Sequence, residues 1–343
     1  NHNSRLHSAL LNVEAQMCLG LTGTPIENRL RELESLFDIV LPMYMPSDSD
    51  YKDFFVKPIE RSHDEGKQNL LKRFIKPFVL RRKKEDVLLD LPEKTEEISY
   101  CDLTHSQAVL YAEVLSQSKE QVMRQVEAGE GPIPYIHIFA ILSALKQICN
   151  HPASYLKQPE AYKSYTSGKW ELFTELLSEA RDSGQKVVVF SQYIAMLKII
   201  ELYLQEHGIG YAIIKGSTTN RAEQLERFNH DPSCEVFIGS LQASGLGVDL
   251  TAASIVIHYD RWWNAARENQ ATDRVHRIGQ TRGVQVFKLV TKGTFEEKID
   301  AMISRKKQLM EETVSVDDKE IIKMFNREEI MDLLKNIEIP ETL

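Results

Sequence analysis

The strongest constraint on the fold is a regular alternation, in the second half of the chain, between short valine- and isoleucine-rich runs and amphipathic segments. The short runs predict strands at 186–190, 211–214, 235–238, 254–259 and 284–290. The amphipathic segments predict helices at 169–182, 194–207, 221–229 and 295–310. Because such alternation produces parallel strands covered by helices on both faces, the sequence predicts an α/β fold built on a parallel sheet.

Small and polar residues follow several of these predicted strands. They are Ser191, Gln192, Lys215, Gly216, Ser217, Thr218, Ser240 and Asp260. Ligands of parallel sheets bind at the carboxyl ends of the strands, and small polar groups suit phosphate contacts that position a nucleic acid without reading its bases. Each of these residues, taken alone, is equally compatible with an ordinary turn.

A helix is predicted after the strand at 254–259, and it carries Gln270, Arg274 and Arg277. Their spacing of i, i+4 and i+7 places the three side chains on one face of that helix. A planar guanidinium binds phosphate through paired hydrogen bonds and can stabilise charge during phosphoryl transfer. The alternative is a solvated face on which the arginines form surface salt bridges.

Several stretches carry a resemblance to a known family. QATDRVHRIGQ (270–280) resembles motif VI of the superfamily 2 helicase-like ATPases, and SGLGVDLTAASIVIHYD (244–260) resembles their motif V. Trp262-Trp263-Asn264 is typical of the Swi/Snf branch, and CLGLTGTPIEN (18–28) resembles motif III. The chain departs from the usual pattern at Arg261 and Ala265, where the family usually has proline, and we expect a changed turn there.

The resemblance implies a RecA-like second lobe of an ATPase that translocates on double-stranded DNA, remodels protein–DNA complexes and uses ATP with Mg²⁺. It implies that Arg274 and Arg277 are arginine fingers reaching ATP held by the first lobe, and that Gln270 senses the nucleotide. Gly245 and Gly247 would let the backbone approach phosphate, and Asp249 would couple that loop to the arginines. The expected DNA contacts are Thr22, Thr24, Ser191, Gln192, Lys215, Gly216, Ser217, Thr218, Ser240, Trp262 and Trp263. For the two tryptophans, packing in the core is the alternative.

No phosphate-binding loop of the form G-x-x-x-x-G-K-[ST] occurs in the 343 residues. Gly168-Lys169-Trp170 lacks the upstream glycine and the hydroxyl residue of that motif. In the family, this loop and the acidic Mg²⁺ motif precede motif III and belong to the first lobe. We therefore expect the C-terminal half of a split active site, inactive without the first lobe as its partner. The rival hypothesis is a non-catalytic DNA- or partner-binding module from a truncated or split gene.

Four regions are expected along the chain. Residues 1–97 would form the remnant of the first lobe, with a strand at 18–21, a protrusion and the connector between lobes. Residues 98–166 would form a helical insertion with helices at 103–127 and 136–149. Residues 167–310 would form the second lobe with a brace helix, and residues 311–343 an acidic tail.

Charge is unevenly distributed along the chain. Its 50 acidic and 42 basic residues give a net charge of −8, and the ten acidic and four basic residues of 311–343 supply most of it. Residues 72–84 hold seven basic residues and no acidic one, a stretch that could bind phosphate or simply be solvated. The four cysteines are scattered without a CxxC pair, so we expect no metal site. No apolar run reaches ~18 residues, so we expect no membrane partner. The resemblance to DNA translocases implies a cytoplasmic, nucleoid-associated location if the protein is bacterial and a nuclear location if it is eukaryotic.

Overall fold

The computed structural model describes residues 5–21, 30–62, 64–80, 82, 84, 88, 90–127, 135–240, 247–262 and 265–301. These residues fall into two compact units that divide between Leu89 and Asp90. The first unit holds the described residues up to Leu88, and the second unit holds those from Asp90 onward.

The second unit is built on one sheet of six strands. The strands are β1 (Lys94–Cys101), β2 (Val187–Ser191), β3 (Gly210–Ile214), β4 (Cys234–Ser240), β5 (Ile255–His258) and β6 (Val284–Thr291). Their order across the sheet is β1-β6-β5-β2-β4-β3, and every pair of neighbours is parallel. The predicted parallel α/β fold is therefore confirmed.

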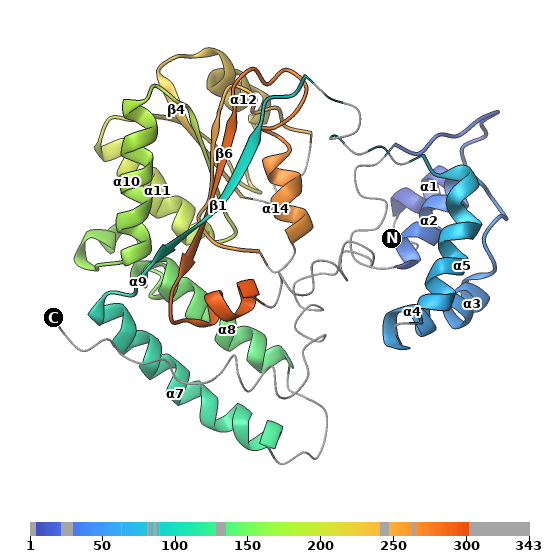
Figure 1. The fold of residues 1–343 in the computed structure, drawn as a ribbon, viewed down its shortest axis with the longest axis horizontal. Coiled ribbons are helices and arrows are strands. Elements are labelled where there is room, and N and C mark those ends of the chain that lie inside the picture. The colour runs from blue at the N-terminus through green and yellow to red at the C-terminus, as the bar shows by residue number, and fades with distance from the viewer. Residues whose placement is uncertain are drawn as a thin grey trace. The chain divides into compact units, whose positions relative to one another are not determined.

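Helices cover both faces of this sheet (Figure 1). On one face Val187 and Val189 of β2 pack against α10 (Gly168–Asp182) and α11 (Ile194–Glu206). On the other face Val188 and Phe190 pack against α12 (Arg221–His230) and α14 (Ala265–Thr272). Both faces of β2 are buried because successive side chains of a strand point to opposite sides. This explains the uninterrupted valine run that marked the strand in the sequence.

The edge strand β1 was not predicted, because its residues were interpreted as a connector between lobes. It pairs with β6 over its full length, from Lys94 opposite Val284 to Cys101 opposite Thr291. Its charged side chains suit an edge position: Glu96 pairs with Lys94 and with Lys288 of β6. The expected boundary after residue 97 therefore falls inside a strand of the second unit, and the contacts divide the chain at 89/90 instead.

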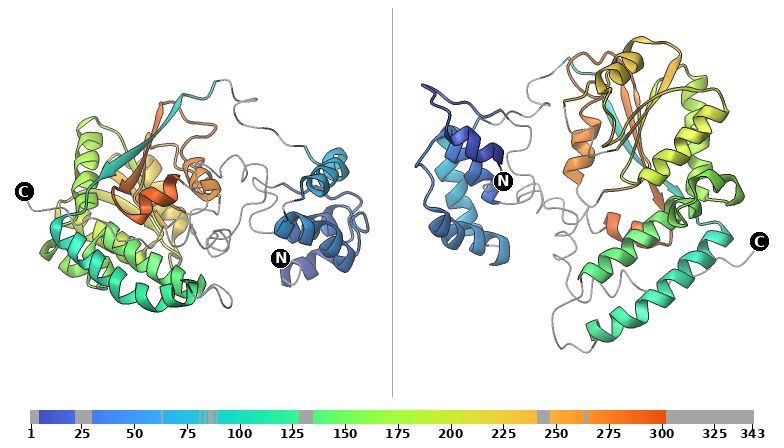
Figure 2. Two further views of the ribbon diagram at one scale, coloured as in Figure 1. Left: turned by 60° about the horizontal axis from the view of Figure 1, so that its bottom comes forward. Right: turned by 180° about the vertical axis from the view of Figure 1, so that it is seen from behind.

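The two helices expected for the helical insertion are present. They are α7 (His105–Glu127) and α8 (Tyr135–Asn150), which pack against each other and lie below the sheet in Figures 1 and 2. Gln107 fixes α7 in place, since its Nε2 donates to Ile148 O at 2.9 Å and its Oε1 accepts from Gly168 N at 3.1 Å. Two short segments, α9 (Pro152–Tyr155) and the 3₁₀ segment η3 (Pro159–Ser164), lead to α10. The last described segment, residues 295–301, is helical, as expected for the start of the helix predicted at 295–310, whose other residues lie outside the described ranges.

The first unit is helical throughout its described elements. These are α1 (Arg5–Leu11), α2 (Leu30–Val40), α3 (Asp48–Tyr51), the π-helical η1 (Lys52–Val56), α4 (Lys57–Ser62), α5 (Glu65–Ile75) and the 3₁₀ turn η2 (Lys76–Phe78). Its core gathers Leu33, Phe37, Tyr51, Phe55 and Leu71.

The strand expected at 18–21 is absent from the structure, and that prediction is wrong. Residues 17–21 have no regular structure, and the side chains of Leu19 and Leu21 are 73% and 96% exposed. A strand needs a hydrogen-bonded neighbour, and the described part of the first unit contains no other strand.

No helix in the described ranges has the length and apolar character needed to cross a membrane.

Candidate functional site

The carboxyl ends of β2 and β5 are joined through Asp260. Its buried carboxylate accepts hydrogen bonds from the Ser191 hydroxyl and, at 3.2 Å, from the Gln192 backbone N–H. Burial raises the pKa of the Asp260 carboxyl above its usual value, against the opposing charge of Lys146. Ser191 is fully buried, so its role here is to hold the two strand ends together and it has no surface to offer to DNA. Gln192 remains partly exposed, and its Nε2 donates to Arg261 O at 3.0 Å.

The neighbouring strands β4 and β3 end at the same edge. Ser240 lies opposite Ser191 in the sheet and is 6% exposed. After β3 the chain turns sharply, with Thr218 N donating to Lys215 O at 3.1 Å and Lys215 N donating to Thr218 Oγ1 at 2.9 Å. Gly216 and Ser217 at the tip of this turn are exposed, and space is open around Gly216. The Lys215 ammonium lies 3.2 Å from Glu201 of α11. The turn therefore presents backbone N–H groups to solvent, the kind of donor that phosphate oxygens accept.

The arginine segment differs from the prediction. α14 ends at Thr272, so Arg274 and Arg277 lie in the turns that follow it and do not continue its face. The helix ends because Arg274 N and Val275 N bond three residues back, to Ala271 O and Thr272 O, while Arg274 O accepts from Leu250 N at 3.0 Å. Gly279, with φ of +100°, then redirects the chain toward β6. Gln270, Arg274 and Arg277 are all partly exposed.

This arginine segment lies near the amino ends of the strands, whereas the polar residues described above lie at their carboxyl ends. His276 Nε2 contacts Pro92 O at 2.8 Å, and Gln280 Nε2 donates to Ala253 O at 2.8 Å. Pro92 and Ala253 stand just before β1 and β5, so the arginines lie near the amino ends of those strands. The structure thus separates the predicted residues into two groups, one with Ser191 and the turn at 215–218, the other with Arg274 and Arg277.

The second group includes part of the loop that resembles motif V. Gly247 is exposed and has a φ of +62°, which suits a glycine. The Asp249 carboxylate accepts from Thr251 N at 3.1 Å, so it shapes its own turn. The contact that the structure shows between this loop and the arginine segment is a backbone hydrogen bond from Leu250 N to Arg274 O.

Sequence reasoning missed the residues that hold this arrangement. Arg261 is 8% exposed and bonds the carboxylates of Glu268 in α14 and Asp300 in the final helical segment. Burial disfavours ionised Glu268, yet Arg261 beside it holds the pKa of Glu268 below its usual value. Lys146 of α8 donates to Arg261 O. The side-chain amide of buried Gln280 donates both to Ala253 O, just before β5, and to Val275 O in the arginine segment. The departure from proline at 261 was visible in the sequence, but its carboxylate partners were not.

Trp262 belongs to the core and not to a DNA-facing surface. Its side chain is 3% exposed and packs in the cluster between the sheet and α12 and α14. The Arg267 guanidinium lies 5.1 Å from its ring, and Trp262 N donates to Glu268 Oε1 at 2.6 Å. This corrects the expectation that Trp262 contacts DNA, since a buried ring cannot reach a duplex. Thr22, Thr24, Gly245 and Trp263 lie outside the described residues.

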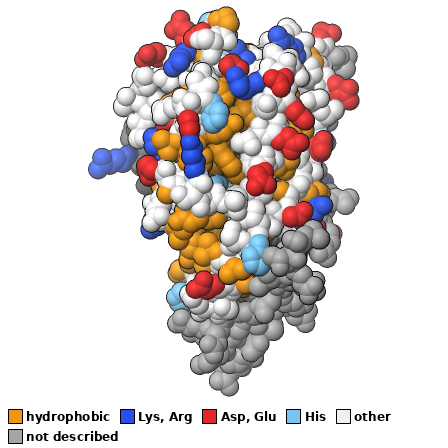
Figure 3. Space-filling view, turned by 90° about the vertical axis from the view of Figure 1, so that its left-hand side faces the viewer, with side chains coloured by type: hydrophobic (Ala, Val, Ile, Leu, Met, Phe, Trp, Pro, Cys, Tyr) orange, Lys and Arg blue, Asp and Glu red, His pale blue; other side chains and the backbone are white. Residues whose placement is uncertain are grey.

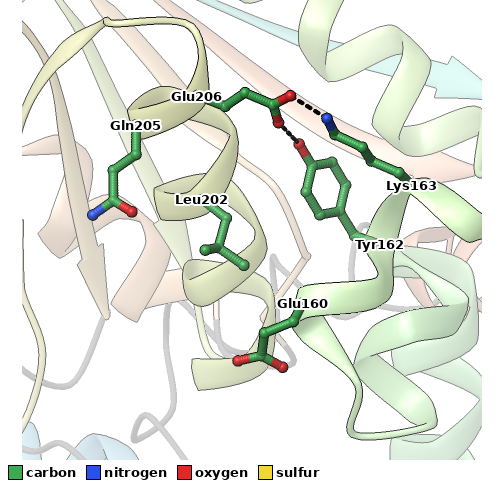
Figure 4. A pocket seen from close by; sticks show the side chains of 6 residues that line it. All are labelled: Glu160, Tyr162, Lys163, Leu202, Gln205 and Glu206. Carbon is green, nitrogen blue, oxygen red and sulfur yellow. Dashed lines mark hydrogen bonds and ion pairs between the residues drawn. The ribbon is translucent and has the colours of Figure 1, made fainter.

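The described surface also contains an open hollow of about 520 Å³ on the α11 side of the sheet (Figure 4). Glu206 at the end of α11 accepts from the Tyr162 hydroxyl at 2.9 Å and pairs with Lys163. Because the one cation lining it is already paired, this hollow offers no anion site. Among the described residues, no three histidine, cysteine or acidic side chains gather in a way that could hold a metal ion.

Comparison with known proteins gives matches over most of the chain. The SNF2-related domain model matches residues 1–154, and the helicase conserved C-terminal domain model matches residues 168–279. An uncharacterized ATP-dependent helicase of Mycoplasma genitalium is 34% identical over 337 residues, which cover 98% of this chain and 31% of that protein. The chain therefore spans about a third of the length of the curated relatives it matches.

Solved structures give the same picture. The Sulfolobus solfataricus SWI2/SNF2 ATPase core in complex with dsDNA matches with a TM-score of 0.59 and 34% identity, covering 99% of this chain and 71% of that chain. The C-terminal domain of the S. solfataricus SWI2/SNF2 ATPase matches with a TM-score of 0.56 and 32% identity, covering 73% of this chain and 100% of that chain.

Proposed function

Since the chain belongs to the SWI2/SNF2 family of ATP-dependent helicase-like proteins, we propose that it is the C-terminal part of a translocase that moves on double-stranded DNA and remodels protein–DNA complexes. The observation that carries the proposal is the separation of two residue groups at opposite edges of one sheet. The segment between β4 and β5 begins at the edge with Ser240 and ends beside the arginines, so it joins the two groups covalently. A machine that converts ATP hydrolysis into movement on DNA needs two such linked sites.

In this proposal the edge with Gln192 and the turn at 215–218 forms part of the DNA track. The exposed backbone of Gly216 and Ser217 and the amide of Gln192 would contact phosphates, which positions the duplex without reading its sequence. Support comes from the S. solfataricus relative, which was solved with double-stranded DNA. Ser191, Asp260 and Arg261 would hold this edge in shape without touching DNA. The protein would act on DNA-bound proteins in the nucleoid or the nucleus.

Arg274 and Arg277 would act as arginine fingers toward ATP bound with Mg²⁺ in a first RecA-like lobe. The guanidinium donors fit phosphate oxygens. The 343 residues include no phosphate-binding loop, so we infer that the nucleotide and its metal are held mainly by that first lobe and that this chain alone hydrolyses no ATP. Gln270, one turn before Arg274, would sense whether the nucleotide is present.

The test compares two single variants of the complete protein, Arg274→Ala and Arg277→Ala, with the wild type. DNA-stimulated ATP turnover should fall by ~10³–10⁵, as for other arginine fingers, while the affinity for DNA is kept. Arg282→Ala is the matched control, because Arg282 is an exposed arginine in the same segment. Turnover retained in both finger variants would refute the assignment.

The missing phosphate-binding loop also favours a second candidate, a non-catalytic DNA- or partner-binding module. ATP hydrolysis by this chain mixed with a separately produced first lobe separates the two. Turnover that appears only on mixing supports a split active site, and DNA binding without turnover in the mixture supports the module.

A further inference from the structure

The first unit carries a basic helix face that the proposed function does not use. The exposed residues Asn69, Lys72 and Arg73 of α5 and its C-cap residue Lys76, which keeps helical backbone angles, follow the spacing i, i+3, i+4 and i+7. The opposite side of the helix carries buried Leu71, with partly buried Phe74 and Ile75 packed against the same core. Helical geometry therefore forces the three cations and the amide into one solvent-facing row, here called the α5 basic face.

Residues 66–84 contain no aspartate or glutamate, and Glu65, which lies on the same face of the helix, stands two turns before Lys72. Two other cations of the unit are paired with carboxylates: Arg31 bonds Asp48, and Lys57 lies 2.6 Å from Asp53. None of the ion pairs between described residues includes Lys72, Arg73 or Lys76. The α5 basic face is thus a local concentration of positive charge on a chain with a net charge of −8.

A second surface gives a useful contrast. On the face of the second unit seen in Figure 3, acidic side chains are spread among apolar and basic ones, with no continuous basic area. Exposed charges of mixed sign repel a polyanion as much as they attract it, whereas an unbroken positive row attracts it. Cations in the last turn of α5 also stabilise the helix through the helix dipole, but that effect requires neither three of them nor their alignment on one face.

We propose that the α5 basic face binds the phosphate backbone of double-stranded DNA, as a contact on the first unit additional to the track on the second. Lys72 and Lys76 are one helical turn apart and, with Arg73 between them, can neutralise adjacent phosphates without reading bases. This inference rests on the proposed function, because it assumes that the protein binds duplex DNA.

The test is DNA binding by the complete protein carrying Lys72→Gln and Lys76→Gln, measured by anisotropy with a fluorescent duplex at several salt concentrations. The slope of log K against log salt is negative, and each lost phosphate contact makes it shallower by about 0.9. The slope of the double variant should therefore be shallower than that of the wild type by about 1.8. At 0.1 M salt the affinity should fall on the order of 60-fold, since each contact contributes about eightfold there. ATP turnover at saturating DNA should be unchanged, with more DNA needed to reach it.

Matched variants separate charge at this face from charge in general. Lys52→Gln with Lys57→Gln removes two exposed lysines from the same unit, but from a region that holds Asp48, Asp50 and Asp53. That control should keep the wild-type slope, and Lys72→Arg with Lys76→Arg should restore it.

A wild-type slope in the Lys72/Lys76 variant would overturn the inference alone. Absence of duplex binding in the wild-type protein would overturn the proposed function with it. If the Lys72→Gln, Lys76→Gln variant lost binding to polyglutamate and kept the wild-type DNA slope, the face would be a docking site for acidic protein. That result would overturn the DNA assignment.

Discussion

Lys169 and Glu296 form an ion pair in the interior of the second unit. The Lys169 ammonium lies 2.9 and 2.7 Å from the two carboxylate oxygens of Glu296, and the two side chains are 0% and 1% exposed. Asn150 Oδ1 also accepts from Lys169 at 3.2 Å, and Glu296 accepts from Thr291 N at 3.0 Å. Burial disfavours the charged amine, but the Glu296 charge raises the pKa of Lys169 above its ordinary value. The pair therefore joins α10 to the start of the final helical segment.

Replacing Lys169 by Met should destabilise the second unit by about 3–5 kcal/mol, because Glu296 would be left charged and uncompensated in the interior. The double variant Lys169→Met with Glu296→Gln removes both charges, and the glutamine oxygen can still accept from Thr291 N. We expect it to regain most of the loss, within about 1–2 kcal/mol of wild type, since buried pairs contribute little beyond an apolar replacement. Lys163→Met, which breaks the exposed pair with Glu206, is the control and should leave the unfolding midpoint unchanged.

Urea unfolding followed by tryptophan fluorescence measures this directly. All three tryptophans of the chain, Trp170, Trp262 and Trp263, stand in the part of the sequence assigned to the second unit, so the signal reports on that unit alone. In a thermal scan the single variant should melt about 6–20 °C lower, at roughly 2–4 °C for each kcal/mol. A single variant within 1 kcal/mol of wild type, or a double variant no more stable than the single, would refute the reasoning.

Two further outcomes follow from buried groups. Burial lowers the pKa of His151 and of His258 from 6.5 to about 4, so as pH falls the unfolded chain binds these protons before the folded chain does. The stability that the two neutral histidines contribute is complete above pH 6.5. It should fall as pH drops toward 4, by up to about 1.4 kcal/mol per pH unit for each histidine. His151→Asn keeps a side-chain acceptor for Ala153 N and should halve that slope in urea midpoints measured from pH 5 to 6.5; an unchanged slope would contradict the assignment. Arg261→Met should cost about 3–5 kcal/mol by leaving Glu268 and Asp300 without their cation, whereas Arg261→Lys should recover part of the loss in the same assay. Equal stability of the two Arg261 variants would show that the buried charge is not what matters there.

Much of the second unit could be predicted from the sequence. β2 and β4 were recognised because strands buried on both faces need continuous apolar runs. β1 was missed for the opposite reason: at the edge of the sheet most of its side chains are at least partly exposed, and KTEEISYC has no such run. α14 was predicted too long, because the pattern Gln270, Arg274, Arg277 fits a helix while the bond from Leu250 N to Arg274 O that accompanies its end comes from a distant segment.

The candidate site divides in the same way. The position after a predicted strand selected the turn at 215–218, and motif resemblance selected the partly exposed arginines, because both depend on short stretches of sequence. The same reasoning also selected Ser191, from its position after a strand, and Trp262, from the motif, although the structure places both in the interior, since sequence spacing does not reveal burial.

By itself the sequence determined the alternation of strands and helices from residue 168 onward, the family and the residues fit to bind phosphate, since these depend on local periodicity and short motifs. Only the tertiary structure decided which edge of the sheet each group occupies and which charges are paired inside. Lys169 and Glu296 are 127 residues apart, and Arg261 and Asp300 are 39 apart. Whether such charges meet is set by the packing of the parallel sheet, because burial in a low-dielectric interior is what makes each partner necessary to the other.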